Sequence, residues 1–325
     1  MDQEISLEKH KDIVLNPWIL FLPYLPVIVI ALAVGIDAAT GYGLAGRLPS
    51  SPYQVFLYSL IFGNPHVIAS TLILLDKEYI RFYGRKIFIR AVFVSIIVAA
   101  ILHYLGMNAF YAFFYSWTIL HVNKQQLGIG KMLNRQYSKQ YDYWSWLFVA
   151  VSIFIAIGVG YFRVNTHVPF QFIHDFVVLG GTLTLLLGLL IVLRIKKDIG
   201  KYYLLSNLAL LAVTMVCYLR GFTLFAILMS RFAHDITAYI FYVTHDINRN
   251  TPKPKQYIYK LTGNRVPIWI VCMVMSIGLA ALLLVNQSVL LFNIAVALNS
   301  FHYITEALTW KRDSLHRKHL SFDLN

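Results

Sequence analysis

Long apolar stretches alternate with short polar and basic segments along almost the whole chain. A helix needs about 20 apolar residues to cross a bilayer. Ten stretches approach that length: 13–36, 52–75, 87–106, 108–131, 143–163, 172–194, 203–219, 222–247, 266–286 and 288–310. The pattern predicts an all-α fold, a polytopic integral membrane helical bundle with about ten transmembrane helices. We expect a tail at 1–12, a transmembrane domain with an intramembrane histidine site at 13–310 and a second tail at 311–325.

The basic residues are distributed unevenly between the two sets of connecting segments. Of the 28 Lys and Arg residues, 23 fall in the termini and in every second connection, three fall in the other connections and two lie within spans. Cytoplasmic segments of membrane proteins carry such an excess. The bias predicts that both termini are cytoplasmic and that the number of spans is even. We expect a multi-pass protein, of a bacterial inner membrane, with its oligomeric state left open.

Composition supports a membrane protein and argues against several other classes. The sequence is 58% hydrophobic and only 13% charged, with a mean hydropathy of +0.62. The net charge of +13 follows from the loop bias and requires no nucleic-acid partner. Cys217 and Cys272 both lie in apolar stretches, so no disulfide framework is expected. The patterns of nucleotide-binding loops, zinc proteases and serine hydrolases are missing from the sequence.

Two segments stand out by their backbone chemistry. Pro65 interrupts the second apolar stretch near its middle, where it removes a helical hydrogen bond and predicts a kink. Residues 248–265 contain two prolines among several basic residues and are predicted to form a solvated loop.

The histidines fall into two groups. We interpret His10, His316 and His319 as tail residues and His103, His167 and His174 as residues near the outer face, all of them surface histidines. The other five, His66, His121, His234, His245 and His302, lie within apolar stretches. Ionisable groups at membrane depth are costly unless they are paired or bound to a metal, so these five define the candidate site.

Three of the five histidines lie at nearly the same predicted depth. The first cytoplasmic basic residue follows His66 by 11 positions, His121 by 10 and His302 by nine. His234 and His245 lie on either side of that depth, in a stretch that also carries Arg231, Asp235 and Asp246. At about 1.5 Å per residue, four predicted helices therefore offer an imidazole near one level of the membrane.

Imidazoles on facing helices are typical of metal sites in helical bundles. We predict that His66, His121, His234 and His302 bind a metal, with His245 as an alternative or additional ligand. Glu306, Asp235 and Gln125 are the candidate catalytic or ligand-orienting residues, and Ser70, one turn after His66, is its expected partner. Each histidine taken alone could equally be a structural polar group, and Arg231 with Asp235 could be a simple ion pair.

The motifs around these histidines resemble those of the Brp/Blh family of bacterial membrane enzymes, which cleave β-carotene to retinal with iron and dioxygen. The segment GNPHVIAS around His66 is similar to the first Pro-His motif of the family, and LHVNKQQLG around His121 to the second. SFHYITEA around His302 stands where the last histidine falls. The chain departs from the family at Ser70 and Gln125, where an acidic partner is usual, and in the 11 positions between His234 and His245.

The resemblance implies non-haem iron (Fe²⁺) as the cofactor and a lipophilic substrate such as a carotenoid. We therefore expect a metal-dependent membrane oxygenase that contacts membrane lipid and a lipophilic small molecule and binds no nucleic acid. Two alternatives remain open. One is a transporter or channel with an intramembrane His, Asp and Arg relay, and the other is a haem protein with two axial histidines or a protein with another transition metal.

Overall fold

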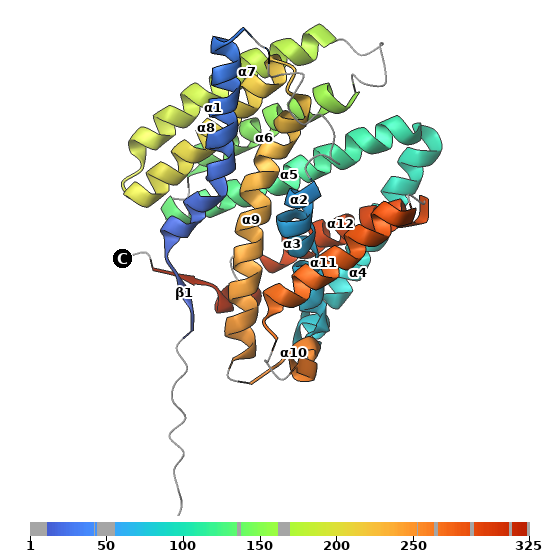
Figure 1. Ribbon diagram of the computed structural model, residues 1–325. Helices are drawn as coiled ribbons and strands as arrows, with labels where there is room; N and C mark the ends of the chain where they lie inside the picture. The colour runs from blue at the N-terminus through green and yellow to red at the C-terminus, as the bar shows by residue number, and fades with distance from the viewer. Residues whose placement is uncertain are drawn as a thin grey trace, which may run out of the picture. The chain divides into compact units, whose positions relative to one another are not determined.

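A computed structural model of this chain describes residues 12–41, 43, 56–134, 138–161, 170–251, 253–262, 266–286, 289–311 and 314–323. Most of these residues are helical (Figure 1), and the strands β1 (Val14–Leu15) and β2 (Ser321–Phe322) have two residues each. The all-α prediction is confirmed for the described residues. The α-helices are α1 (Leu25–Ala39), α2 (Phe56–Tyr58), α3 (Asn64–Leu72), α4 (Lys77–Tyr104), α5 (Gly106–Asn134), α6 (Lys139–Tyr161), α7 (Phe170–Arg194), α8 (Asp198–Leu219), α9 (Thr223–Asn250), α10 (Tyr257–Thr262), α11 (Ile268–Asn286) and α12 (Val289–Thr309).

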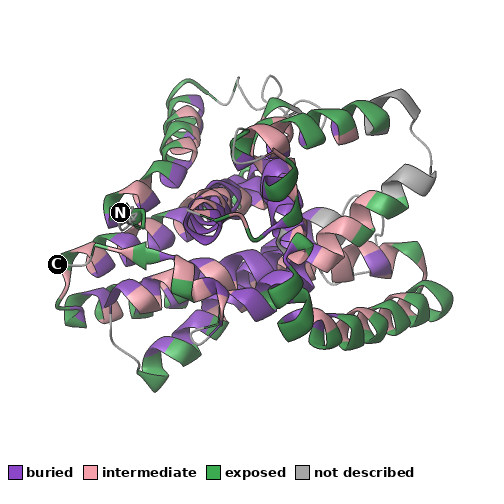
Figure 2. Ribbon diagram, turned by 90° about the horizontal axis from the view of Figure 1, so that it is seen from below, coloured by how far each residue is buried: buried purple, intermediate pink, exposed green. Residues whose placement is uncertain are grey.

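Six helical segments among the described residues are long and apolar enough to cross a membrane. They are Pro17–Ala39, Lys77–Tyr104, Lys139–Val159, Gln171–Arg194, Asp198–Leu219 and Thr223–Asn250, and a shorter apolar helix covers Ile268–Leu282. Large apolar side chains such as Val29, Phe88 and Leu193 are exposed on α1, α4 and α7. Figure 2 shows that exposed residues run along the outer faces of several helices. Such surface is unfavourable in water and suits lipid. The total of ten spans and the side on which the termini lie stay predictions.

The connecting segment expected between the stretches 52–75 and 87–106 is helical, because α4 begins at Lys77 and is helical throughout its 28 residues. Lys and Arg are good helix formers, and their long apolar stems let a helix end lie at a membrane surface. The basic residues of this segment therefore stand on the first turns of a helix. The expected loop at 248–265 is also partly helical, because α9 continues to Asn250 and α10 covers Tyr257–Thr262.

The helix around Pro65 is irregular at the predicted place. A π-helical segment, η3 (Ser59–Gly63), directly precedes α3, and the Asn64 N–H donates to the Ser59 carbonyl. Proline at the second residue of α3 has no N–H to donate, and a π turn is one way in which a helix accommodates that loss. Regular α-helical geometry therefore begins at Asn64, one residue before Pro65 and two before His66.

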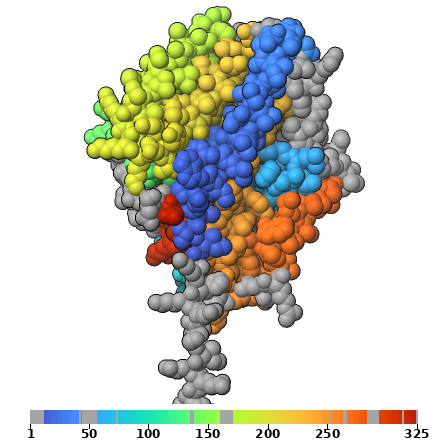
Figure 3. All heavy atoms as spheres, turned by 60° about the vertical axis from the view of Figure 1, so that its left-hand side comes forward, coloured from blue at the N-terminus to red at the C-terminus, as the bar shows by residue number. Residues whose placement is uncertain are grey.

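The described chain divides into two compact units. One contains residues 1–17, 58–92 and 238–325, and the other contains 18–57 and 93–237; we call them the terminal unit and the central unit. In the central unit α5, α6, α7 and α8 pack against one another in sequence. Helix α1 lies against α8 (Figure 3). In the 3-10 helix η1 (Pro17–Tyr24), which directly precedes α1, Trp18 contacts Tyr202 and Phe21 contacts Tyr203.

In the terminal unit, α3 packs against both α11 and α12. The two ends of the chain also meet there, because β1 pairs in parallel with β2 and aligns Val14 with Ser321. The interpretation of His316 as a surface residue of a tail is wrong, since its side chain is fully buried and its ring stacks on that of His245. The Leu315 N–H donates to the Tyr83 hydroxyl, so residues 314–323 pack into the unit.

Candidate metal centre

The terminal unit brings His66 on α3 and His302 on α12 into direct contact. Their Nε2 atoms lie 3.2 Å apart, and the ring planes are inclined by 77°. Both side chains are almost fully buried. The register of α3 after the π segment and the packing of α3 on α12 produce this contact, between residues more than two hundred positions apart in the chain.

The hydrogen bonds of the other ring nitrogens select the same neutral tautomer for both rings. His66 Nδ1 lies 3.1 Å from the Phe62 carbonyl oxygen, which can only accept, so Nδ1–H donates there. The Ser70 hydroxyl donates to the Val67 carbonyl, and its oxygen lies 2.8 Å from His302 Nδ1. His302 Nδ1–H therefore donates to Ser70. In neutral imidazoles both Nε2 atoms then carry lone pairs, and these two lone pairs face each other.

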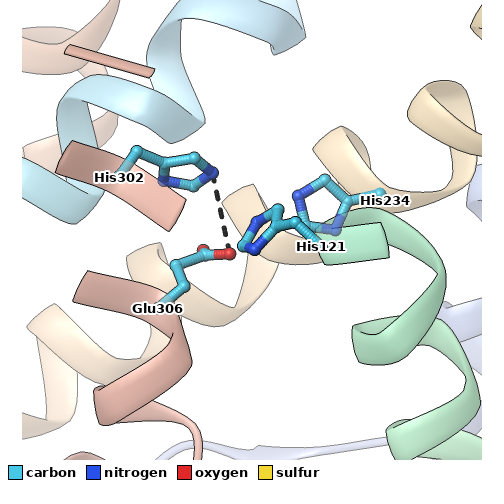
Figure 4. Close-up of side chains that lie close together, drawn as sticks. All are labelled: His121, His234, His302 and Glu306. Carbon is cyan, nitrogen blue, oxygen red and sulfur yellow. Dashed lines mark ion pairs between the residues drawn. The ribbon is translucent and has the colours of Figure 1, made fainter. Parts of the chain in front are cut away.

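Glu306 adds a carboxylate to the same place. It is fully buried one turn after His302, and its Oε2 lies 3.6 Å from His302 Nε2, as the dashed line in Figure 4 marks. The Trp310 indole N–H donates to the other oxygen, Oε1, at 3.4 Å. Trp310 thus holds the carboxylate so that Oε2 faces the nitrogen that also faces His66.

The two imidazole nitrogens are spaced as ligands of a metal ion with a coordination bond of about 2.1 Å would be, and Glu306 Oε2 faces the nitrogen of His302. Neighbouring ligand nitrogens on such an ion lie about 3.0 Å apart in an octahedral site and about 3.4 Å apart in a tetrahedral site, and the 3.2 Å between His66 and His302 falls within that range. A cation would also relieve the repulsion between the lone pairs. This buried group of histidines and a glutamate can therefore hold a metal ion.

The central unit contains the other two histidines of the predicted set. His121 on α5 and His234 on α9 are buried, their ring centroids are 5.1 Å apart and the rings are nearly perpendicular (Figure 4). Both side chains offer a ligand nitrogen within 4.8 Å of the other. Asp235 forms the expected ion pair with Arg231, at 3.3 Å. Whether Asp235 also orients His234 stays a prediction.

Gln125, the predicted partner of His121, is half-buried, and its role as a ligand-orienting residue stays a prediction. Gln126, by contrast, is buried and accepts hydrogen bonds from the hydroxyls of Tyr24 and Tyr203. The adjacent amides were indistinguishable in the sequence, because the face of α5 that packs on α8 was not known.

His245 belongs to a separate buried network in the terminal unit. Its Nδ1 lies 2.8 Å from Asp246 Oδ1 and its Nε2 lies 2.9 Å from the Tyr79 hydroxyl. Arg249, one turn later on α9, binds Asp76 at 2.9 Å and also pairs with Glu78. Both ring nitrogens of His245 thus have protein partners, and its role as an additional metal ligand stays a prediction.

The C-terminal segment contributes two more histidines to that network, and both are kept neutral. Burial, together with nearby His245 and Arg249, lowers the pKa of His319 to about 4. Burial also lowers the pKa of His316, with His245 and His319 adding to the effect. Sequence reasoning missed this network, because a segment after the last apolar stretch gave no sign that it would be buried. His103 is exposed as expected and His174 is half-buried, while His10 and His167 lie outside the described residues.

Ser70 and Glu306 have contacts that differ from the expected ones. Ser70 was expected to be the partner of His66, but its oxygen is bonded to His302, since its hydroxyl hydrogen points back along α3 to Val67. Glu306 was expected to orient His302, yet it faces the ligand nitrogen of that ring. Trp310 was missed, although its position four residues after Glu306 is the helical spacing that brings the two side chains together.

We compared the chain with protein-family models, with curated proteins and with solved structures, and none of them matches it.

Proposed function

We propose that this protein is an integral-membrane, non-haem iron oxygenase that acts on a lipophilic substrate. The observation that carries the proposal is that both His66 and Glu306 contact the buried Nε2 of His302. Two histidines and one carboxylate with open coordination positions are the donor set of non-haem Fe(II) oxygenases. The resemblance to the Brp/Blh motifs around His66 and His302 points to the same chemistry.

Each residue of the proposed site has a defined role. His66, His302 and Glu306 bind the ion, and His121 and His234 stay the further ligands predicted from the sequence. The Phe62 carbonyl and the Ser70 hydroxyl fix the tautomers, so that both Nε2 lone pairs are available. Trp310 positions the carboxylate. The bound iron would supply the site for dioxygen and the electrons for its reduction.

A lipid-soluble substrate fits the surroundings of such a site. The candidate spans expose large apolar side chains where lipid would contact them, so a hydrophobic molecule can reach the protein from the bilayer. The Brp/Blh resemblance favours a carotenoid within this class, and another lipid is the alternative.

Metal analysis of purified protein tests the proposal. We expect about one iron per chain in detergent-purified protein, and we expect His302→Ala and His121→Ala to lose it. His103→Ala is the matched control, because it removes an exposed histidine and should leave the iron content unchanged. Folded wild-type protein without metal, or a His302→Ala variant with full iron content, would contradict the proposal.

The haem alternative is disfavoured for the histidines of the terminal unit. Two axial ligands lie on opposite faces of a haem, about 4 Å apart and with the macrocycle between them, whereas His66 and His302 face each other at 3.2 Å. Protein that carries iron but shows no Soret band would contain non-haem iron, and a Soret band would indicate haem.

A transporter is the second candidate, and the π segment before Pro65 favours it, because discontinuous helices form ion sites in transporters. It would show ion flux in liposomes without stoichiometric metal.

A further inference from the structure

A basic pocket lies in the terminal unit, between the start of α4 and the end of α12. Its volume is about 370 Å³, and it is lined by Phe82, Tyr83, Lys86, Arg90, Leu308, Lys311 and Ser314. None of these residues belongs to the candidate metal centre, and Tyr83 borders the His245 network through its ring contacts with Tyr79 and His316. The size is that of a small-molecule site.

The charged side chains among the described residues that line the pocket are all cationic. Lys86 and Arg90 lie one turn apart on α4, and Lys311 follows the end of α12. Among the residues that the structure describes, no carboxylate lies within ion-pair distance of these three cations, whereas Lys131 and Arg249 do form ion pairs. Lys86 Nζ lies 5.2 Å from the centre of the Phe82 ring, so its ammonium has a cation–π contact with another residue that lines the pocket.

The position of the pocket along the chain places it near a membrane surface. Lys86, Arg90 and Lys311 all belong to segments predicted to be cytoplasmic from the distribution of basic residues. Helix α4 is a candidate span, and only 6% of the residues in its most apolar stretch are buried. Phe88 and Ile89, between the two cations of α4, are 68% and 54% exposed. Cationic side chains thus alternate with apolar side chains suited to acyl chains.

We propose that this pocket binds the phosphate group of an anionic membrane lipid. The three cations would surround the phosphate, and the apolar residues of α4 would contact the acyl chains. Basic pockets at the cytoplasmic ends of transmembrane helices bind anionic headgroups in this way. Inorganic phosphate carries the same charge as a lipid phosphate but has no acyl chains. The exposed apolar residues Phe88 and Ile89 favour a lipid as the ligand.

Lipid titration of the full-length protein tests the proposal. Detergent-solubilised protein is titrated with phosphatidylglycerol, with phosphatidylcholine and with inorganic phosphate, and the thermal midpoint and the retained lipid in native mass spectrometry are recorded. We expect phosphatidylglycerol to bind and the triple variant Lys86→Gln, Arg90→Gln, Lys311→Gln to weaken its affinity about tenfold or more.

The matched control removes the same charge from the same side of the protein. The triple variant Lys77→Gln, Arg81→Gln, Arg85→Gln changes three exposed cations of α4 outside the pocket, and we expect its affinity to stay within about twofold of wild type. An equal loss in both variants would show attraction to net charge and overturn the proposal. Equal binding of phosphatidylcholine, or of inorganic phosphate at the same concentration, would also overturn it. If a triple variant fails to fold, Lys86→Gln and Arg85→Gln are compared in its place.

Discussion

At the scale of single residues, the contact between His66 and His302 is the feature that needs a cation. Both Nδ1 atoms donate to oxygen atoms, so both Nε2 atoms present lone pairs at 3.2 Å, next to the Glu306 carboxylate. Burial of three electron-pair donors together is unfavourable unless a proton or a metal ion is shared among them. Removal of the groups that orient them should therefore weaken metal binding.

Ser70→Ala tests this expectation. The variant loses the oxygen that accepts from His302 Nδ1–H, so the ring is free to rotate or to change tautomer. We expect metal affinity, measured by competition with a chelator, to fall about 10- to 100-fold. Thr71→Ala is the control, because the Thr71 hydroxyl makes the same kind of bond to the carbonyl three residues earlier but contacts neither histidine in the bonds described. Equal losses in the two variants would mean that Ser70 acts through helix stability alone.

The histidines of the site could be predicted from the sequence, because ionisable side chains within a membrane are unfavourable unless they have a partner or bind a metal. His66 and His302 share a predicted depth, and α3 and α12 bring them together. Their hydrogen-bond partners could not be predicted. The rotation of each helix about its axis decides whether Ser70 faces His66 or His302, and that rotation depends on packing between segments far apart in the chain.

At the scale of helices, close approach between α5 and α8 depends on a glycine. A Cβ atom added at Gly200 would lie 1.7 Å from Asn134 Oδ1 and 3.1 Å from Asn134 Cα. The side-chain oxygen could move aside, but the backbone atom belongs to the last residue of α5. A side chain at position 200 would therefore push the two helices apart.

Gly200→Ala should destabilise the protein by about 1–3 kcal/mol, the usual cost of overpacking. A lower midpoint of thermal unfolding in detergent is the expected result. Gly35→Ala on α1 is the control, because among the described residues no atom beyond its own stretch of helix backbone lies within 4 Å of the added Cβ. Alanine has the better helix propensity, so this variant should leave the midpoint equal or raise it. A Gly200→Ala midpoint at or above that of wild type would show that the helices separate without cost.

The elements that were predicted correctly have a strong local signal, and those that were missed depend on distant contacts. Pro65 marks its own irregularity, because it lacks an N–H. The first turns of α4 were predicted to be a connecting segment because they are rich in basic residues, although Lys and Arg favour helices. The burial of His316 depends on its stacking against His245, a contact that no local pattern contains.

At the scale of the whole molecule, the pairing of the chain ends constrains the membrane topology. Strand β1 pairs with β2 within the terminal unit, and the Asn248 side chain bonds the backbone of both Ile13 and His319. Segments that pair directly lie on the same side of a membrane. The pairing therefore supports an even number of spans, and the cytoplasmic location of both ends stays the expectation drawn from the basic residues.

Topology mapping tests this expectation in two independent ways. Reporters fused to either terminus, one fluorescent only in the cytoplasm and one enzymatically active only outside it, should both indicate the cytoplasm.

Arg85 and His103 lie 18 positions apart on the single helix α4, a separation of about 27 Å along its axis, close to the thickness of the hydrocarbon core. In intact cells a membrane-impermeant thiol reagent should label His103→Cys, and it should label Arg85→Cys only after permeabilisation; Cys217 and Cys272 are buried and give little background. Termini on opposite sides would contradict the β1–β2 pairing, and labelling of both cysteines in intact cells would exclude α4 as a membrane span.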